Sequence, residues 1–220
     1  MARIEFSHIR LVDFLKSLHF PITAFRLLDT LRRKGYKVLV PYPPPVPRTH
    51  RVYVSGRIAE KNGCIIVIDS DKRFMGVEGT NLRTVKAIYE ELSSLVTEEF
   101  GINMSDERDY LEFVCEGIIR TRKIAFKEIG RAFMDAKIVK KVSEILGEEV
   151  MTHTISFVPL DRMSSDKEWF EIRLLPHIGL PTREYEFTVV YRSPDCQKVR
   201  KFYEDVESKL LMIVEAIEAG

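Results

Sequence analysis

Arginine and tyrosine alternate with apolar residues along the segment 51–58, and this pattern is suited to binding nucleic acid. In an extended strand, alternation places four polar side chains on one face: Arg51, Tyr53, Ser55 and Arg57. Guanidinium groups contact phosphates and aromatic rings stack on bases, so a face that carries both could bind a nucleic acid. Three arginines on other predicted strands are expected to join this face: Arg73, Arg173 and Arg192.

Acidic residues and a near-neutral charge weigh against this interpretation. Glu78, Glu171 and Glu186 lie on the same predicted strands, and the formal net charge is +1. Residues 1–105 carry 16 Lys+Arg and 11 Asp+Glu, a net charge of +5, and residues 106–220 carry 18 and 22, a net charge of −4. Neither half is basic enough to indicate a nucleic-acid-binding protein by charge alone. A solvated sheet face is the alternative explanation of the alternating pattern.

The sequence contains no arrangement typical of a catalytic, cofactor or metal site. It has no glycine-rich phosphate loop and no nucleophile-elbow motif, and its five histidines do not have metal-ligand spacing. Cys64, Cys115 and Cys196 lie far apart in the sequence, so we expect buried free thiols rather than disulfides or a zinc site. The sequence therefore favours a non-catalytic protein without a cofactor, although an enzyme whose active residues converge from distant positions stays open.

Two segments could instead contact a protein partner. The proline-rich segment 41–47 is typical of a polyproline II stretch, which either binds a partner or forms a stiff hairpin loop. In the segment 210–214, apolar residues extend beyond a single helical stripe, which indicates burial between two halves of the chain or a homodimer contact. A protein-interaction or assembly module with no nucleic-acid role is the alternative function, and a monomer and a homodimer both stay open.

An internal repeat determines the predicted architecture. Residues 85–94 and 199–208 match in the order of their apolar, charged and aromatic positions, at an offset of 114 residues. Both segments have the spacing of amphipathic helices. A capping residue, Asn81 or Asp195, precedes each helix at the matching position. We therefore expect two related halves.

Each half is predicted to be a strand, a helix, several antiparallel strands and a final helix. In the first half the predicted strands are 4–6, 36–40, 51–58, 64–69 and 73–79, with a helix over 21–34. In the second half the predicted strands are 110–113, 150–158, 169–175 and 186–192, with a helix over 126–146. Residues 9–18 have helical spacing, so the first strand is expected to be very short. The halves are assigned to residues 1–100 and 110–220, with 101–109 as the connector.

The segment 64–81 resembles part of the TATA-box-binding-protein fold. It has a strand, a polar turn that contains Lys72, a strand that ends near Gly79 and Thr80, and the capped helix. The order of elements along nearly the whole chain is similar to the tandem half-domains of that family. The resemblance implies an α+β pseudo-twofold repeat with helices on one face of a curved antiparallel sheet. The family's kinking phenylalanine pairs have no counterpart in residues 41–54, so the resemblance implies the fold and not the TATA-box activity.

Composition indicates the source and the compartment. Three asparagines and one glutamine stand against 67 charged residues, a tendency of thermophile proteins. The first six residues lack the features of a signal peptide, and no apolar run reaches the roughly 18 residues that cross a bilayer. We therefore expect a cytoplasmic, thermophilic protein without a membrane partner.

Overall fold

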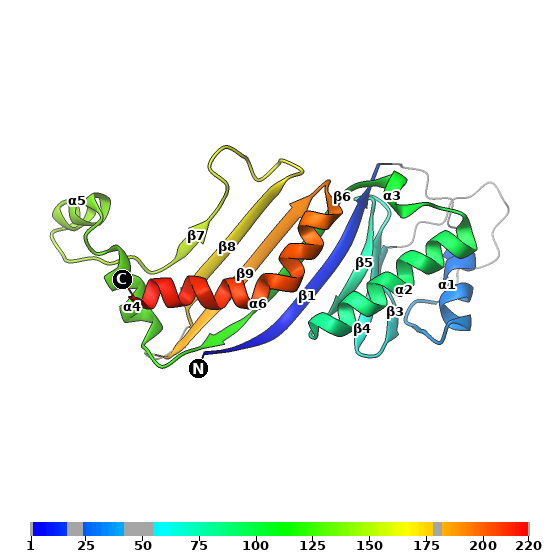
Figure 1. Cartoon of the computed structure of the whole chain (residues 1–220), viewed down its shortest axis with the longest axis horizontal. Coiled ribbons are helices and arrows are strands. Elements are labelled where there is room, and N and C mark those ends of the chain that lie inside the picture. The colour runs from blue at the N-terminus through cyan, green and yellow to red at the C-terminus, as the bar shows by residue number, and fades with distance from the viewer. Residues whose placement is uncertain (1, 17–23, 42–54, 178–181, 220) are drawn as a thin grey trace. The chain divides into compact units, whose positions relative to one another are not determined.

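A computed structural model describes residues 2–16, 24–41, 55–177 and 182–219, and within them six helices and nine strands form an α+β fold (Figure 1). The strands form an open antiparallel sheet in the order β2-β3-β4-β5-β1-β6-β9-β8-β7. The strands are β1 Arg3–Leu15, β2 Lys37–Val38, β3 Ser55–Lys61, β4 Cys64–Asp69, β5 Phe74–Gly79, β6 Arg108–Arg120, β7 Ile155–Phe157, β8 Trp169–Pro176 and β9 Glu184–Ser193. The helices are α1 Ala24–Arg33, α2 Leu82–Phe100, α3 Met104–Glu107, α4 Ala125–Phe133, α5 Lys137–Leu146 and α6 Cys196–Ala219.

The chain divides into two compact units. Unit 1 comprises Met1–Ser7, Cys115–Tyr191 and Arg200–Gly220, and unit 2 comprises His8–Val114 and Arg192–Val199. Strands β1, β6 and β9 and helix α6 contribute residues to both units. The repeat boundaries at 1–100, 101–109 and 110–220 come from sequence similarity and stay a prediction.

In unit 2, helix α2 packs on strands β4 and β5, and helix α1 packs on β2 and β3 (Figure 1). The side-chain oxygen of Asn81 accepts a hydrogen bond from the Thr84 amide at 3.1 Å, as the predicted cap requires. The helix ends at Gly101, whose positive φ of 68° suits a residue without a Cβ atom. One stripe of α2 is buried against the sheet: Val85, Ile88, Tyr89, Leu92, Leu95 and Val96.

Strand β1 is a single strand of 13 residues, so the prediction of a very short first strand is wrong. Its residues 9–14 pair in antiparallel register with β5, from Ile9 opposite Gly79 to Phe14 opposite Phe74. Backbone pairing with a neighbouring strand keeps this segment extended, although its apolar residues also have helical spacing. Pairing with β5 therefore determines the conformation of this segment, and its helical spacing of apolar residues does not.

The continuous helix predicted over 126–146 is also wrong, because α4 ends at Phe133 and α5 begins at Lys137. On one continuous helix, Ile129 and Ile138 would lie about 180° apart, since each residue turns the helix by about 100°. Ile129 is fully buried in unit 1, whereas Ile138 is 66% exposed. A single helix therefore has no common apolar face, and the chain breaks between the two segments.

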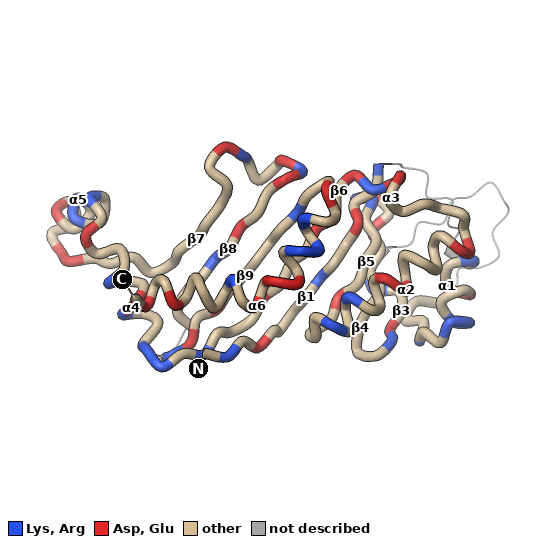
Figure 2. The backbone as a smooth tube through the Cα atoms, in the orientation of Figure 1, with Lys and Arg blue, Asp and Glu red and all other residues tan. Residues whose placement is uncertain are grey.

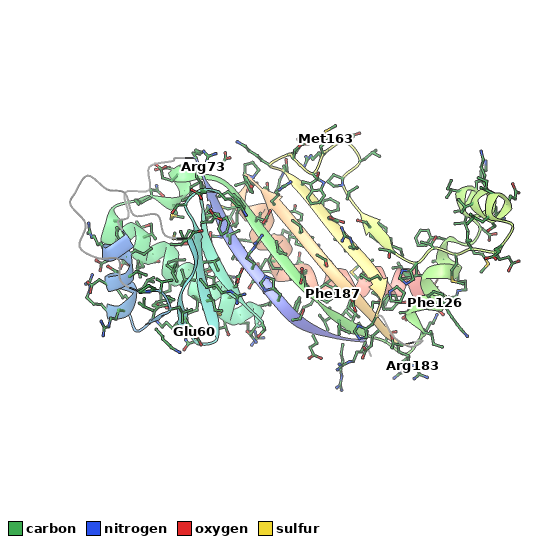
Figure 3. All side chains as sticks on the ribbon, turned by 180° about the vertical axis from the view of Figure 1, so that it is seen from behind. Glu60, Arg73, Phe126, Met163, Arg183 and Phe187 are labelled. Carbon is green, nitrogen blue, oxygen red and sulfur yellow. The ribbon has the colours of Figure 1, made fainter. Side chains whose placement is uncertain are left out.

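Helix α6 covers one face of strands β8 and β9 in unit 1, as the two opposite views agree (Figures 1 and 3). Tyr191 of β9 stacks on Phe202 of α6 with ring centroids 4.2 Å apart. The predicted cap Asp195 accepts a hydrogen bond from the amide of Gln197 at 2.9 Å. Within the apolar segment 210–214, Leu210 and Val214 are buried and Met212 is exposed.

Smaller differences concern boundaries. The predicted connector contains the short helix α3, and β7 is much shorter than the predicted strand 150–158. Cys64, Cys115 and Cys196 are free; the first two are buried and the third is half-buried. Burial raises the pKa of Cys64 and of Cys115, which keeps both thiols neutral. Among the described residues, no helix combines the length and the apolarity that a membrane span requires.

Candidate nucleic-acid interface

The sheet of unit 2 has one face that the described helices leave uncovered (Figure 3). Asp13 of β1 points toward α2, because it accepts a hydrogen bond from the hydroxyl of Tyr89 at 2.7 Å. Side chains alternate along a strand, so Arg10 and Phe14 point to the opposite side. We call this side of the unit 2 sheet the open face.

Three aromatic rings from three strands form a row on the open face. The rings of Phe14 on β1 and Tyr110 on β6 are stacked, with centroids 4.4 Å apart and planes 14° apart. Phe74 on β5 lies on the other side of Phe14, with centroids 5.5 Å apart. All three side chains are half-buried, so part of each ring faces solvent. The register of β1 with β5 produces this row, because it places Phe14 directly opposite Phe74.

Two arginines lie at the two ends of this aromatic row. The guanidinium carbon of Arg10 is 5.9 Å from the ring centroid of Phe74, and that of Arg192 is 5.8 Å from the ring of Tyr110. Both separations lie within the range of about 6 Å over which a cation is attracted to a ring face. Together with Glu112, these residues form the aromatic–arginine cluster.

Glu112 joins the two arginines. Its carboxylate oxygens lie 2.9 Å from Nη2 of Arg10 and 3.6 Å from Nη1 of Arg192. Burial, with the nearby carboxylate of Glu112, raises the pKa of Tyr110, so its hydroxyl stays neutral and able to donate a hydrogen bond. Two guanidinium groups and one carboxylate leave the cluster with a net positive charge.

Arg10 contributes to the cluster a buried donor that lacks an acceptor among the described residues. Arg10 Nε is buried, and no hydrogen-bond partner for it exists among the described residues. A buried donor without an acceptor costs about 1–3 kcal/mol. An acceptor oxygen that reached this nitrogen would remove that cost.

The predicted site residues of unit 2 are only partly brought together. Arg192 lies in the aromatic–arginine cluster. Arg57 lies on β3, exposed, with its guanidinium 3.3 Å from the carboxylate of Glu78. Arg73 lies in the turn before β5, where its φ is +57° and its Nη1 donates to the backbone oxygen of Lys16 at 3.2 Å (Figure 3).

The other predicted site residues lie outside this cluster or outside the described chain. Arg51 and Tyr53 lie outside the described residues. Arg173 lies on β8 in unit 1, where its Nη2 donates to Glu171 at 2.6 Å. The prediction that all six form one interface stays untested.

Five members of the cluster were not predicted from the sequence: Arg10, Phe14, Phe74, Tyr110 and Glu112. The available signal was the alternation of Arg10, Val12 and Phe14, which has the period of a strand. Because residues 9–18 also have helical spacing, this alternation was not taken as evidence of a strand. The other members become neighbours only through strand pairing.

The opposite face carries a buried polar cluster of a different kind. Nε of Arg108 donates to Oδ1 of Asp13, and its Nη2 donates to the hydroxyl of Tyr89 at 3.2 Å. Burial disfavours the charged guanidinium, but the Asp13 carboxylate outweighs this effect and raises the pKa of Arg108. All three residues are buried, so this cluster joins β1, β6 and α2 rather than meeting a ligand.

No cation site accompanies either cluster. Within residues 2–16, 24–41, 55–177 and 182–219, no group of three or more His, Cys, Asp or Glu residues could hold a metal ion. The candidate site therefore consists of aromatic rings, guanidinium groups and one carboxylate.

The chain has no significant match among protein-family models, curated proteins or solved structures.

Proposed function

We propose that the open face of unit 2 binds single-stranded nucleic acid through the aromatic–arginine cluster. The observation that carries this proposal is the row of Phe74, Phe14 and Tyr110 with an arginine at each end. Unpaired bases stack on aromatic rings and guanidinium planes, and guanidinium groups also bind phosphate oxygens. The site residues predicted from the sequence contribute Arg192 directly and Arg57 on a nearby strand.

A single strand suits this face better than a duplex. Binding to a duplex depends on many phosphate contacts, whereas Glu78 and Glu112 offset much of the positive charge on this face. Stacking on aromatic rings needs bases that are free of a partner strand. The ligand class is therefore a single-stranded segment of DNA or RNA, bound without a catalytic step or a cofactor.

The fold proposal is a tandem repeat related to the TATA-box-binding-protein fold. The strand order in the sheet supports it. From the centre outward, one side of the sheet runs β1, β5, β4, β3, β2, and the other side runs β6, β9, β8, β7. Each series is closed by a long helix with a capping residue, α2 or α6. A cytoplasmic location agrees with three free thiols, which a reducing compartment maintains.

Fluorescence anisotropy with labelled single- and double-stranded DNA and RNA tests the function. We expect micromolar binding to a single-stranded probe at low salt and weaker binding to the duplexes. With two or three phosphate contacts, the logarithm of the binding constant should fall with the logarithm of salt concentration with a slope of about −1.4 to −2. Absence of binding to every probe at low salt would contradict the proposal.

A protein-interaction module is the second candidate function. Leu160 and Met163, between β7 and β8, are 96% and 73% exposed, and exposed large apolar side chains are typical of contact surfaces (Figure 3). If no nucleic acid binds, we propose this segment of unit 1 as the surface that contacts a protein partner.

A further inference from the structure

Helix α5 presents an apolar face that nothing in the described chain covers. No residue of the helix is buried, and three of its large apolar side chains are more than half exposed: Ile138 at 66%, Ile145 at 71% and Leu146 at 62%. Ile138, Val142 and Ile145 are four and three residues apart, so they follow one stripe of the helix. Met134, just before the helix, is also exposed. A stripe of this kind is typical of a helix that packs against another element.

The charges of α5 are separated along its length (Figure 2). Lys137, Lys140 and Lys141 occupy the amino-terminal half. Glu144 lies in the carboxyl-terminal half of the helix. Glu148 and Glu149 follow the end of the helix after Gly147. Asp135, two residues before the helix, pairs with Lys140 at 3.1 Å, so three lysines and one carboxylate still leave the amino-terminal end basic, and the carboxyl-terminal end is acidic.

This order of charges is unfavourable for a helix on its own. The amino terminus of a helix carries a partial positive charge and prefers acidic residues, and the carboxyl terminus prefers basic ones. The first turn of α5 has no acidic residue and its last turn has no basic residue. Its N-cap, Ala136, makes no side-chain capping hydrogen bond. A helix of 10 residues with these features is marginal in water without a packing partner.

We propose that α5 pairs in antiparallel orientation with the α5 helix of a second copy of this chain. Twofold symmetry places the same surface on both copies, so a self-complementary surface is required. Antiparallel pairing brings the basic half of each helix beside the acidic half of the other, and the two apolar stripes meet between them. A parallel pair would place lysines against lysines, so charge repulsion favours the antiparallel orientation.

The association should be weak and sensitive to salt. Two helices of this length bury less than the roughly 1,200 Å² of a standard interface, so we expect a dissociation constant in the micromolar range or above. The complementary charges are exposed, and salt therefore screens them. This dimer contact lies on α5 and differs from the homodimer contact predicted from the sequence at residues 210–214 of α6.

Sedimentation velocity over a range of concentrations, with paired charge-reversal variants, tests this proposal. The basic half is reversed by Lys137→Glu, Lys140→Glu and Lys141→Glu, and the acidic half by Glu144→Lys, Glu148→Lys and Glu149→Lys. Each triple variant should dimerise at least about tenfold more weakly than the unchanged protein, a loss of about 1.4 kcal/mol. An equimolar mixture of the two variants should recover dimers, because their helices are again complementary.

Ile145→Glu provides a separate test of the apolar stripe and should also weaken dimerisation. None of these side chains is buried, so circular dichroism and the unfolding midpoint should stay close to those of the unchanged protein. A protein that stays monomeric at the highest concentration overturns the proposal. So does a dimer that both charge-reversal variants retain, since its contact would then lie elsewhere, on another surface of the chain.

Discussion

Replacing Arg108 with methionine is expected to lower the free energy of unfolding by about 3–5 kcal/mol. The substitution removes the cation that faces the buried carboxylate of Asp13, while Tyr89 still donates to this carboxylate at 2.7 Å. An uncompensated buried charge is far more costly than the loss of an exposed ion pair. Equilibrium unfolding in urea, followed by circular dichroism, measures the change.

Matched variants separate this buried charge from general damage. Tyr89→Phe removes the hydrogen bonds to Asp13 and from Arg108 and should cost about 1–3 kcal/mol, and Arg83→Ala, on the exposed side of α2, should change stability by less than about 0.5 kcal/mol. The double variant Asp13→Leu with Arg108→Met should recover much of the loss, because neither charge is then buried alone. A cost for Arg108→Met similar to that of Arg83→Ala would show that the buried pair does not hold β1, β6 and α2 together.

The second large effect concerns binding to the open face. Tyr110→Ala removes one end of the aromatic row and should weaken binding of a single-stranded probe about 5- to 150-fold, since stacking contributes about 1–3 kcal/mol per base. Arg192→Ala should weaken binding and also make the salt dependence shallower by about 0.7 in slope, because one phosphate contact is lost. Anisotropy titrations at several salt concentrations measure both quantities.

Two controls accompany these titrations. Arg83→Ala removes an exposed arginine from the helix-covered side of the same unit and should leave binding unchanged. Arg192→Lys keeps the charge but loses the planar group that lies over Tyr110, so it should retain the salt dependence while binding more weakly. Equal losses for Arg83→Ala and Arg192→Ala would indicate non-specific attraction and would contradict a site on the open face.

Elements with a strong local signal were predicted well from the sequence. The strand 64–69 coincides with β4, and Asn81 and Asp195 cap the helices α2 and α6 as expected. In each case the residues that determine the structure lie within a few positions of one another. The α+β class followed from the same local patterns.

Elements that depend on distant partners were predicted less well. The length of β1 depends on its pairing with β5, and the break between α4 and α5 depends on what each helix packs against. The aromatic–arginine cluster shows the same limit, because Phe14, Phe74 and Tyr110 are separated by 60 and 36 residues in the sequence. Only strand order and register make them neighbours. Arg192 was predicted only as one of three arginines on other strands, without its neighbours in the cluster.

Ultraviolet crosslinking of a bound single-stranded probe, with the modified peptides identified by mass spectrometry, shows directly whether bases contact the aromatic row of the open face. Stacked aromatic side chains lie in direct contact with bases, so we expect crosslinks at Phe14, Phe74 or Tyr110 and a loss of these crosslinks in Arg192→Ala at physiological salt. Crosslinks confined to the surfaces of α1 and α2, or a probe that binds without any crosslink on the open face, would contradict it.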